Sequence, residues 1–335
     1  MKVAWIVDAP LDRKTGGTIY DAIIVEGMRA RGVEIEVHFV SLGNAQRLIR
    51  DLVRARPDVI VGDELCFAAL DIVFEHASFA RRVLLVHHLT CWELELAAGP
   101  RARARRLEAR VLRKADRIVA TSTTTRKRLI AEGAQARIDV IRPGADRLPR
   151  HVRRATNDVI ELIFVGAIVP RKRVIELVHA FASASSSAHL TIVGSRERDE
   201  RYVARVDDLV RGLGLSRRVT CVGEIDETKL ADRLAQAHAL VLPSSLEGYG
   251  IAATEALHAG VPVLAARTDG LVEALASTGD AVIFVANQLE LARSIAEVTQ
   301  DQPRRARLIE AASRAGAALP SWSASIEEFQ RVLMD

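Results

Sequence analysis

Short runs of apolar, often β-branched residues alternate with helix-like patterns along the whole chain. A parallel strand that is covered by helices on both faces is apolar throughout, so runs of this kind predict buried strands joined by helices. The pattern therefore predicts an α/β protein built from two similar, doubly wound, Rossmann-like domains. The predicted strands are residues 3–7, 34–40, 59–61, 83–86, 117–120 and 138–141 in the first half, and residues 162–165, 190–193, 219–222, 239–242, 262–265 and 282–285 in the second.

The length of 335 residues agrees with two domains, since a domain has about 150 residues. Prolines and basic residues interrupt the periodic pattern between residues 146 and 158, which places one domain at residues 1–150 and the other at residues 151–315. Residues 316–335 are expected to form a C-terminal helix that packs back towards the first domain. Doubly wound sheets bind ligands at the carboxyl ends of their strands, so we expect the two domains to face each other across a cleft.

Composition and charge narrow the class of protein. With 49% hydrophobic and 27% charged residues, the chain has the composition of a folded globular protein, not of a disordered one. The net charge of +4 is spread evenly, so we expect no nucleic-acid partner. Three dispersed cysteines indicate neither disulfides nor a zinc site. No apolar run approaches the roughly 18 residues of a membrane span and no signal peptide is visible, which predicts a cytoplasmic location.

One segment, residues 101–117, is strongly basic and follows a helical pattern. Such a helix can rest on an anionic membrane, here at the inner face, or meet a phosphorylated acceptor. The other interpretation is a solvated helix face that is packed by its leucines. The basic residues are Arg101, Arg103, Arg105, Arg106, Arg110, Arg113, Lys114 and Arg117.

The most informative segment follows the predicted strand 239–242. A loop at residues 244–250 contains two glycines and leads into a helix at about residues 251–259. The free backbone N–H groups and the positive dipole end of a helix that starts in this way form a site for an anion, here a phosphate.

The same loop also fits the dinucleotide fingerprint G-x-G-x-x-A at Gly248, Gly250 and Ala253. In a dinucleotide site the turn follows the strand directly, whereas residues 243–247 intervene here and Glu247 would bring a carboxylate to the pyrophosphate. Glu247 and Glu255 are instead well suited to accept hydrogen bonds from the hydroxyls of a nucleotide sugar. A nicotinamide-dependent dehydrogenase and a non-enzymatic, two-lobed sugar- or nucleotide-binding protein remain the alternatives.

The stretch from Pro243 to Val263, with seven residues between Glu247 and Glu255, resembles the E-x7-E signature of family 4 retaining glycosyltransferases, which have the GT-B fold. Further features of that family occur in order: Thr15 to Thr18, His87 and His88, Thr121 and Ser122, and the segments 140–146 and 164–172. The resemblance implies a hexosyltransferase (EC 2.4) that moves a sugar from a nucleoside-diphosphate sugar to an acceptor hydroxyl with retention of the anomeric configuration.

The resemblance also assigns the donor site. It implies that Glu247 holds hydroxyls of the donor sugar and Glu255 the ribose diol, whereas the simpler interpretation makes them a solvated loop acid and a helix N-terminal acid. Gly166 and Glu224 are assigned to the same site. Backbone amides that would hold the diphosphate are those of Gly248, Tyr249, Gly250, Ile251 and Ala252.

Lys172 is the cation expected to neutralise the leaving diphosphate, although a surface basic run is the alternative interpretation. The family usually has an arginine at the position of Ala167, and we suppose that Arg171 or Arg173 replaces it. Arg171 is included in the donor site. No Asp-x-Asp pair occurs in the chain, so we expect neither a metal nor a cofactor beyond the nucleotide sugar.

In the first domain, Gly16 and Gly17 lie between a strand and a helix. The resemblance implies that they approach the phosphate and sugar of the donor, and an ordinary tight turn is the alternative. His87, at the end of a buried strand, is expected to face the donor sugar, while a structural histidine is the other interpretation. Glu247, His87 and Lys172 form the predicted catalytic set. The sequence leaves open the base (UDP or GDP), the sugar, the acceptor (small molecule, glycan or lipid) and the oligomeric state.

Overall fold

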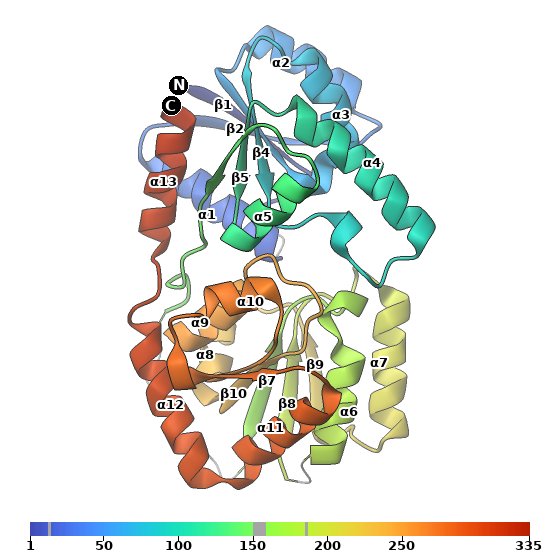
Figure 1. The fold of residues 1–335 in the computed structure, drawn as a ribbon, viewed down its shortest axis with the longest axis vertical. Helices are drawn as coiled ribbons and strands as arrows, with labels where there is room; N and C mark the ends of the chain where they lie inside the picture. The colour runs from blue at the N-terminus through green and yellow to red at the C-terminus, as the bar shows by residue number, and fades with distance from the viewer. Residues whose placement is uncertain (13–14, 150–158, 185–186) are drawn as a thin grey trace. The chain divides into compact units, whose positions relative to one another are not determined.

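The computed structural model describes residues 1–12, 15–149, 159–184 and 187–335. The described chain divides into two compact units, of which the first comprises Met1–Pro143 and Trp322–Asp335 and the second Gly144–Ser321. Most of the predicted boundary segment, residues 146–158, lies outside the described residues, and the division by contacts falls earlier, between Pro143 and Gly144. In each unit the strands lie at the centre with helices around them (Figure 1).

The sheet of the first unit is parallel and has the strand order β2-β1-β3-β4-β5-β6. This arrangement is a doubly wound one, in which the chain leaves β1 on one side to form β2 and then returns past β1 to form β3. The strands are β1 (Lys2–Val7), β2 (Glu34–Phe39), β3 (Val59–Asp63), β4 (Arg81–Val86), β5 (Arg117–Ala120) and β6 (Arg137–Val140). The helices are α1 (Gly16–Ala30), α2 (Ala45–Ala55), α3 (Phe67–His76), α4 (Ala98–Lys114), α5 (Thr123–Ala131) and α13 (Trp322–Met334), with short 3₁₀ turns η1 (Glu64–Cys66) and η2 (Thr90–Trp92).

The sheet of the second unit is also parallel, with the order β12-β11-β10-β7-β8-β9. The strand order reverses between β7 and β10, and a doubly wound sheet binds its ligand at such a point. The strands are β7 (Glu161–Val165), β8 (His189–Val193), β9 (Val219–Gly223), β10 (Ala239–Leu242), β11 (Val263–Ala266) and β12 (Val282–Val285). The helices are α6 (Val174–Ala184), α7 (Glu200–Gly212), α8 (Glu227–Gln236), α9 (Ile251–His258), α10 (Asp269–Ala274), α11 (Gln288–Gln300) and α12 (Gln302–Gly316), with 3₁₀ turns η3 (Pro170–Lys172) and η4 (Gly279–Ala281).

Local sequence explains where these helices begin. The side chains of Thr15 and Thr18 form a capping box at the start of α1, and Asp226 accepts a hydrogen bond from the backbone N–H of Lys229 at the start of α8. Asp301 caps α12, which also has a proline in its first turn. These caps satisfy backbone donors that a helix leaves without partners at its N-terminus. The helices that flank the strands therefore start at defined points.

The basic residues of α4 are partly engaged in ion pairs inside the first unit. Arg110 and Lys114 both contact Asp71 of α3, each at 2.8 Å, and Arg105 lies 3.2 Å from Glu132 at the end of α5. These pairs tie α4 to its neighbouring helices, and the predicted membrane contact stays a prediction.

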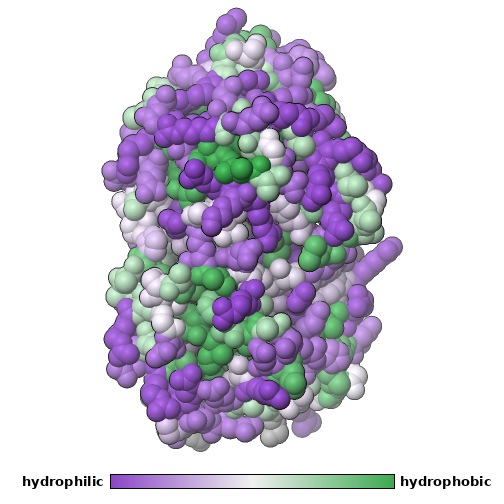
Figure 2. Space-filling view, viewed as in Figure 1, coloured by the Kyte–Doolittle hydropathy of each residue, from purple (hydrophilic) through white to green (hydrophobic). Residues whose placement is uncertain are grey.

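The face seen in Figure 2 carries hydrophilic residues over much of its area. Among the described residues, no helix combines the length and the apolar character that crossing a bilayer requires.

The C-terminal helix α13 belongs to the first unit and packs against β1 and α1. The ring of Phe329 is fully buried, with its centroid 5.3 Å from that of Trp5, and Trp322 meets Tyr20 edge to face at 5.6 Å. Gly27 of α1 allows this contact, because a Cβ atom there would lie 2.3 Å from Cδ1 of Ile326. The last helix therefore completes the core of the first unit.

We predict that Phe329→Ala lowers the free energy of unfolding of the first unit by about 3–5 kcal/mol, because it removes a buried ring and leaves a cavity. Met334→Ala, in the same helix, is the control because this side chain is 64% exposed. Denaturant unfolding followed by circular dichroism measures both variants. If the two variants unfold at the same midpoint, α13 is not part of this core.

Candidate active site

The candidate site in the second unit is formed by the loops that follow β7 and β10. These two strands are neighbours in the sheet, so their carboxyl ends, and the loops at residues 166–172 and 243–250, lie together. The backbone N–H of Ser245 donates to the carbonyl of Arg171 at 2.8 Å, which joins the loops through the main chain. The structure thus brings together two segments that the sequence analysis selected separately.

A buried ion pair links the same two loops through side chains. Nζ of Lys172 lies 2.5 Å from Oε1 of Glu247, and the two side chains are only 12% and 8% exposed. Burial holds the pKa of Lys172 below its usual value, against the raising effect of the Glu247 carboxylate. Burial also raises the pKa of Glu247, but the positive charges of Lys172 and Arg171 outweigh it and leave this pKa below its usual value. The site therefore holds a cation and an anion that have already lost most of their water.

Arg171 and Arg173, the two candidates for the missing arginine, differ in their positions. Nη1 of Arg171 donates to the carbonyl of Leu246 at 3.3 Å, so this guanidinium lies on the loop that carries Glu247. Arg173 is exposed and adopts a left-handed backbone conformation at the start of α6. Arg171 therefore contacts the loop that carries Glu247, and its role as a second cation stays a prediction.

Glycines allow the loops to approach one another closely. Gly250 has φ +105° at the start of α9, and no side chain caps this helix. A Cβ atom at Gly270 of α10 would lie 2.2 Å from the carbonyl oxygen of Glu247, and one at Gly194 would lie 2.0 Å from that of Gly166. Gly166 in turn lies beside the side chain of Lys172. The backbone at Gly194 and Gly270 therefore has no room for a Cβ atom.

Glu255, on the first turns of α9, is buried and has an unexpected partner. Nε and Nη2 of Arg147 donate to its two carboxylate oxygens at 2.6 and 3.0 Å. Nη1 of Arg147 also donates to Glu227 at 2.8 Å. Burial lowers the pKa of Arg147, but the two carboxylates outweigh this effect and raise it, whereas burial raises the pKa of Glu255 and Arg147 opposes that shift. A ribose diol at Glu255 would have to share this carboxylate with Arg147.

Sequence reasoning missed Arg147 as a member of the site. The residue directly follows the segment 140–146, which had been singled out, but no local pattern relates it to a glutamate more than 100 positions later. Glu224, in contrast, was predicted from the sequence to belong to the site. The structure places it in an exposed position directly after the edge strand β9. In the described chain no hydrogen bond or ion pair joins Glu224 to Glu247, Lys172 or Glu255.

In the first unit, His87 follows β4 and is held from several sides. Its backbone N–H donates to the buried carboxylate of Glu64, and its ring meets Tyr20 edge to face at 5.2 Å. A Cβ atom at Gly17 would lie 3.2 Å from Cδ2 of His87, so a side chain there would require the imidazole to shift. Gly16, by contrast, has nothing within 4 Å of such an atom.

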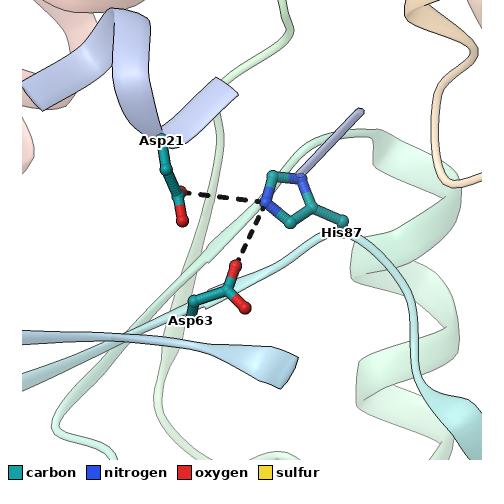
Figure 3. A group of neighbouring side chains, drawn as sticks. All are labelled: Asp21, Asp63 and His87. Atoms are coloured by element: carbon teal, nitrogen blue, oxygen red, sulfur yellow. Dashed lines mark ion pairs between the residues drawn. The ribbon is translucent and has the colours of Figure 1, made fainter. Parts of the chain in front are cut away.

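The imidazole of His87 directs Nε2 at two buried carboxylates, Asp63 at 3.5 Å and Asp21 at 3.9 Å (Figure 3). Burial lowers the pKa of His87, but Glu64 and Asp63 outweigh it and raise this pKa. The sequence analysis did not select Asp21. The helical pattern could have indicated Asp21, because it lies on the buried face of α1 together with Thr18, Val25 and Met28. A buried carboxylate needs a charged or hydrogen-bonding partner.

Solved structures with the same arrangement of elements define the class of fold. Sucrose-phosphate synthase from Thermosynechococcus elongatus superposes with a TM-score of 0.83 at 19% identity, covering 99% of this chain and 98% of that one. HepE from Anabaena, solved in complex with UDP and glucose, also has a TM-score of 0.83, at 18% identity, and the match covers 100% and 99% of the two chains. The protein therefore has the GT-B fold, which confirms the predicted class.

Comparison of sequences identifies the family. The model for group 1 glycosyl transferases matches residues 150–315, and that for the glycosyl transferase 4-like domain matches residues 39–144. The D-inositol 3-phosphate glycosyltransferase 2 of Catenulispora acidiphila is 29% identical over 275 residues, which is 71% of this chain and 63% of that relative. The chain belongs to the family 4 glycosyltransferases, as its E-x7-E segment predicts. It spans less than two thirds of the length of the curated relatives it matches.

We predict that Gly270→Ala destabilises the second unit by about 1–3 kcal/mol, since the new methyl group would collide with the carbonyl of Glu247. The control is Gly212→Ala in α7, where a Cβ atom meets nothing within 4 Å and stability should be unchanged or slightly raised. Urea unfolding measures both variants. Equal stability of the two would show that α10 does not press on the Glu247 loop.

Proposed function

We propose that this protein transfers a sugar from a nucleoside-diphosphate sugar to an acceptor hydroxyl, with retention at the anomeric carbon and without a metal ion at the diphosphate. The observation that carries the proposal is the buried pair of Lys172 and Glu247 beside the N-terminus of α9. A cation, a hydroxyl-accepting carboxylate and the backbone amides at the start of α9 match the three parts of such a donor. Family membership supports the same class of reaction.

The diphosphate of the donor would lie against the first turn of α9, where the helix dipole favours negative charge. Lys172 would neutralise the charge that grows on the diphosphate as the bond to the sugar breaks. Because Lys172 is already buried and held by Glu247, this stabilisation would need little rearrangement during the reaction. Arg171, on the adjacent loop, would add a second positive charge.

Glu247 and Glu255 would recognise hydroxyls and would not act as nucleophiles. Glu247 would accept hydrogen bonds from the sugar, and Glu255 from the ribose. The acceptor oxygen would then bond to the anomeric carbon on the face from which the diphosphate leaves, and the departing diphosphate would take the acceptor proton. With Lys172 supplying the positive charge, added Mg²⁺ or Mn²⁺ should not raise the rate.

The donor base is proposed as uridine or guanosine. The neighbouring HepE structure was solved with UDP and glucose, which supports a uridine donor as the first one to test. The competing function is that of a nicotinamide-dependent dehydrogenase, which the turn at Gly248 and Gly250 favours. A dinucleotide would bring its pyrophosphate to the carboxylate of Glu247, and that contact is unfavourable.

Binding of nucleotides separates the two functions. The parent protein should bind UDP or GDP and show no response to NAD. Glu255→Ala should weaken the binding by about tenfold to a hundredfold, because it removes a charged hydrogen-bond acceptor of the ribose. Glu310→Gln in α12, an exposed acid of the same unit, should bind like the parent. Isothermal titration calorimetry is the measurement, and parent-like affinity of Glu255→Ala would refute the assigned site.

Turnover tests the role of Lys172. Lys172→Met should reduce kcat by about 10²–10³-fold, the usual effect of removing one group that stabilises transition-state charge. It also leaves Glu247 buried without its cation, so the variant should lose stability. The double variant Lys172→Met/Glu247→Gln should recover stability but not turnover. Product formation by NMR measures the rate and the anomeric configuration, and unchanged kcat or an inverted product would contradict the mechanism.

A further inference from the structure

Three buried side chains of the first unit converge on one point. Asp21 comes from α1, Asp63 from the end of β3 and His87 from the residue after β4, and Figure 3 shows both carboxylates directed at Nε2 of the imidazole. One oxygen of each carboxylate and this nitrogen all lie within 4.8 Å of one another. The carboxyl ends of β3 and β4 meet at one edge of the sheet, and this placement explains why residues distant in sequence come together.

The converging atoms have no hydrogen-bond partner within the described part of the chain. They are Oδ1 of Asp21, Oδ2 of Asp63 and Nε2 of His87, and each is inaccessible to solvent. The separations of 3.5 and 3.9 Å from Nε2 are too long for direct hydrogen bonds. Burying such groups without partners is costly, so a species bound between them would be stabilising.

The charge around this point indicates a cation. Asp21, Asp63 and Glu64 are all less than 7% exposed, and the charged groups that act on Asp21 are the carboxylates of Asp63 and Glu64. His87 and His88 are the facing groups that can carry positive charge. His88 lies 3.3 Å from Glu64, which leaves the imidazole of His87 as the group that faces Asp21 and Asp63.

We propose that Asp21, Asp63 and His87 bind a divalent transition-metal ion, of which Zn²⁺ fits best. Ligands about 2.0–2.2 Å from a tetrahedral zinc ion are roughly 3.4 Å apart, close to the 3.5 and 3.9 Å that separate Nε2 from the two oxygens. One imidazole and two carboxylates suit zinc, and water would take the fourth position.

The surroundings fix each ligand in place. Oδ1 of Asp63 accepts a hydrogen bond from the backbone N–H of Leu65 at 2.8 Å, and this contact leaves Oδ2 directed at the centre. The backbone of His87 is held by Glu64 and its ring by Tyr20 and Gly17. Such support of ligand orientation is typical of metal sites, where it raises affinity. A metal ion at this site would differ from the expectation, drawn from the sequence, that the protein binds no metal. No step of the proposed sugar transfer is assigned to it.

The test is metal binding by the full-length chain without any nucleotide. After treatment with a chelator, the protein should bind one equivalent of Zn²⁺ in calorimetry, and Co²⁺ should give visible absorption bands of a tetrahedral site. The Kd for Zn²⁺ should rise by at least about tenfold in each of the variants Asp21→Asn, Asp63→Asn and His87→Gln. His76→Gln, a histidine on α3 of the same unit, is the matched control and should bind like the parent.

The stability of the variants distinguishes an ion from a shared proton. In chelator, Asp21→Asn should be at least as stable as the parent, because it removes one of the crowded negative charges, and it should lose the stabilisation that Zn²⁺ gives the parent. If the parent binds neither Zn²⁺ nor Co²⁺ saturably, or if the three variants bind like His76→Gln, the proposal is wrong and a proton shared by the carboxylates neutralises the cluster. A failure of nucleotide binding, by contrast, would bear only on the proposed function.

Discussion

The ion pair of Lys172 and Glu247 is the interaction on which the candidate active site depends. It joins the loops that follow β7 and β10, at the point where the strand order of the second sheet reverses. A buried pair of this kind contributes little net stability, because the loss of hydration offsets the attraction of the charges. Its value lies in fixing two charged groups in a dry position. A ligand that binds there meets charges that have already been oriented and stripped of water.

The close backbone packing around this pair follows from the same requirement. Gly166, Gly194, Gly250 and Gly270 each occupy a position where a side chain would collide with its neighbours or strain the backbone. They bring the β7 loop, the β10 loop and α10 together at distances that only a missing Cβ atom permits. The charges of Lys172 and Glu247 can therefore be buried without large cavities. These glycines of the second unit therefore form the turns of the loops and also allow the loops to bury the ion pair.

The sequence predicts much of this arrangement because the relevant signals are local. The strands are continuous apolar runs, and the segment from Glu247 to Glu255 combines a loop, a helix start and two acids within nine residues. The pairing of Arg147 with Glu255 had no such signal, since two residues 108 positions apart meet only through the fold. Asp21 was visible as a carboxylate on an apolar helix face, but its partners come from β3 and from the end of β4. Periodicity shows that a residue is buried, whereas its neighbours depend on strand order.

Three groups of buried charges can be compared in this protein. Glu247 is balanced by Lys172, and Glu255 by the two parallel hydrogen bonds of Arg147, so each of these carboxylates has its cation within the same unit. The cluster of Asp21, Asp63 and His87 differs, because its inward atoms have no hydrogen-bond partner in the described chain. The sequence has 47 lysines and arginines, and the fold places a basic side chain beside each of the two buried glutamates. The proposed metal ion would add positive charge at the third cluster beyond that of the His87 imidazole.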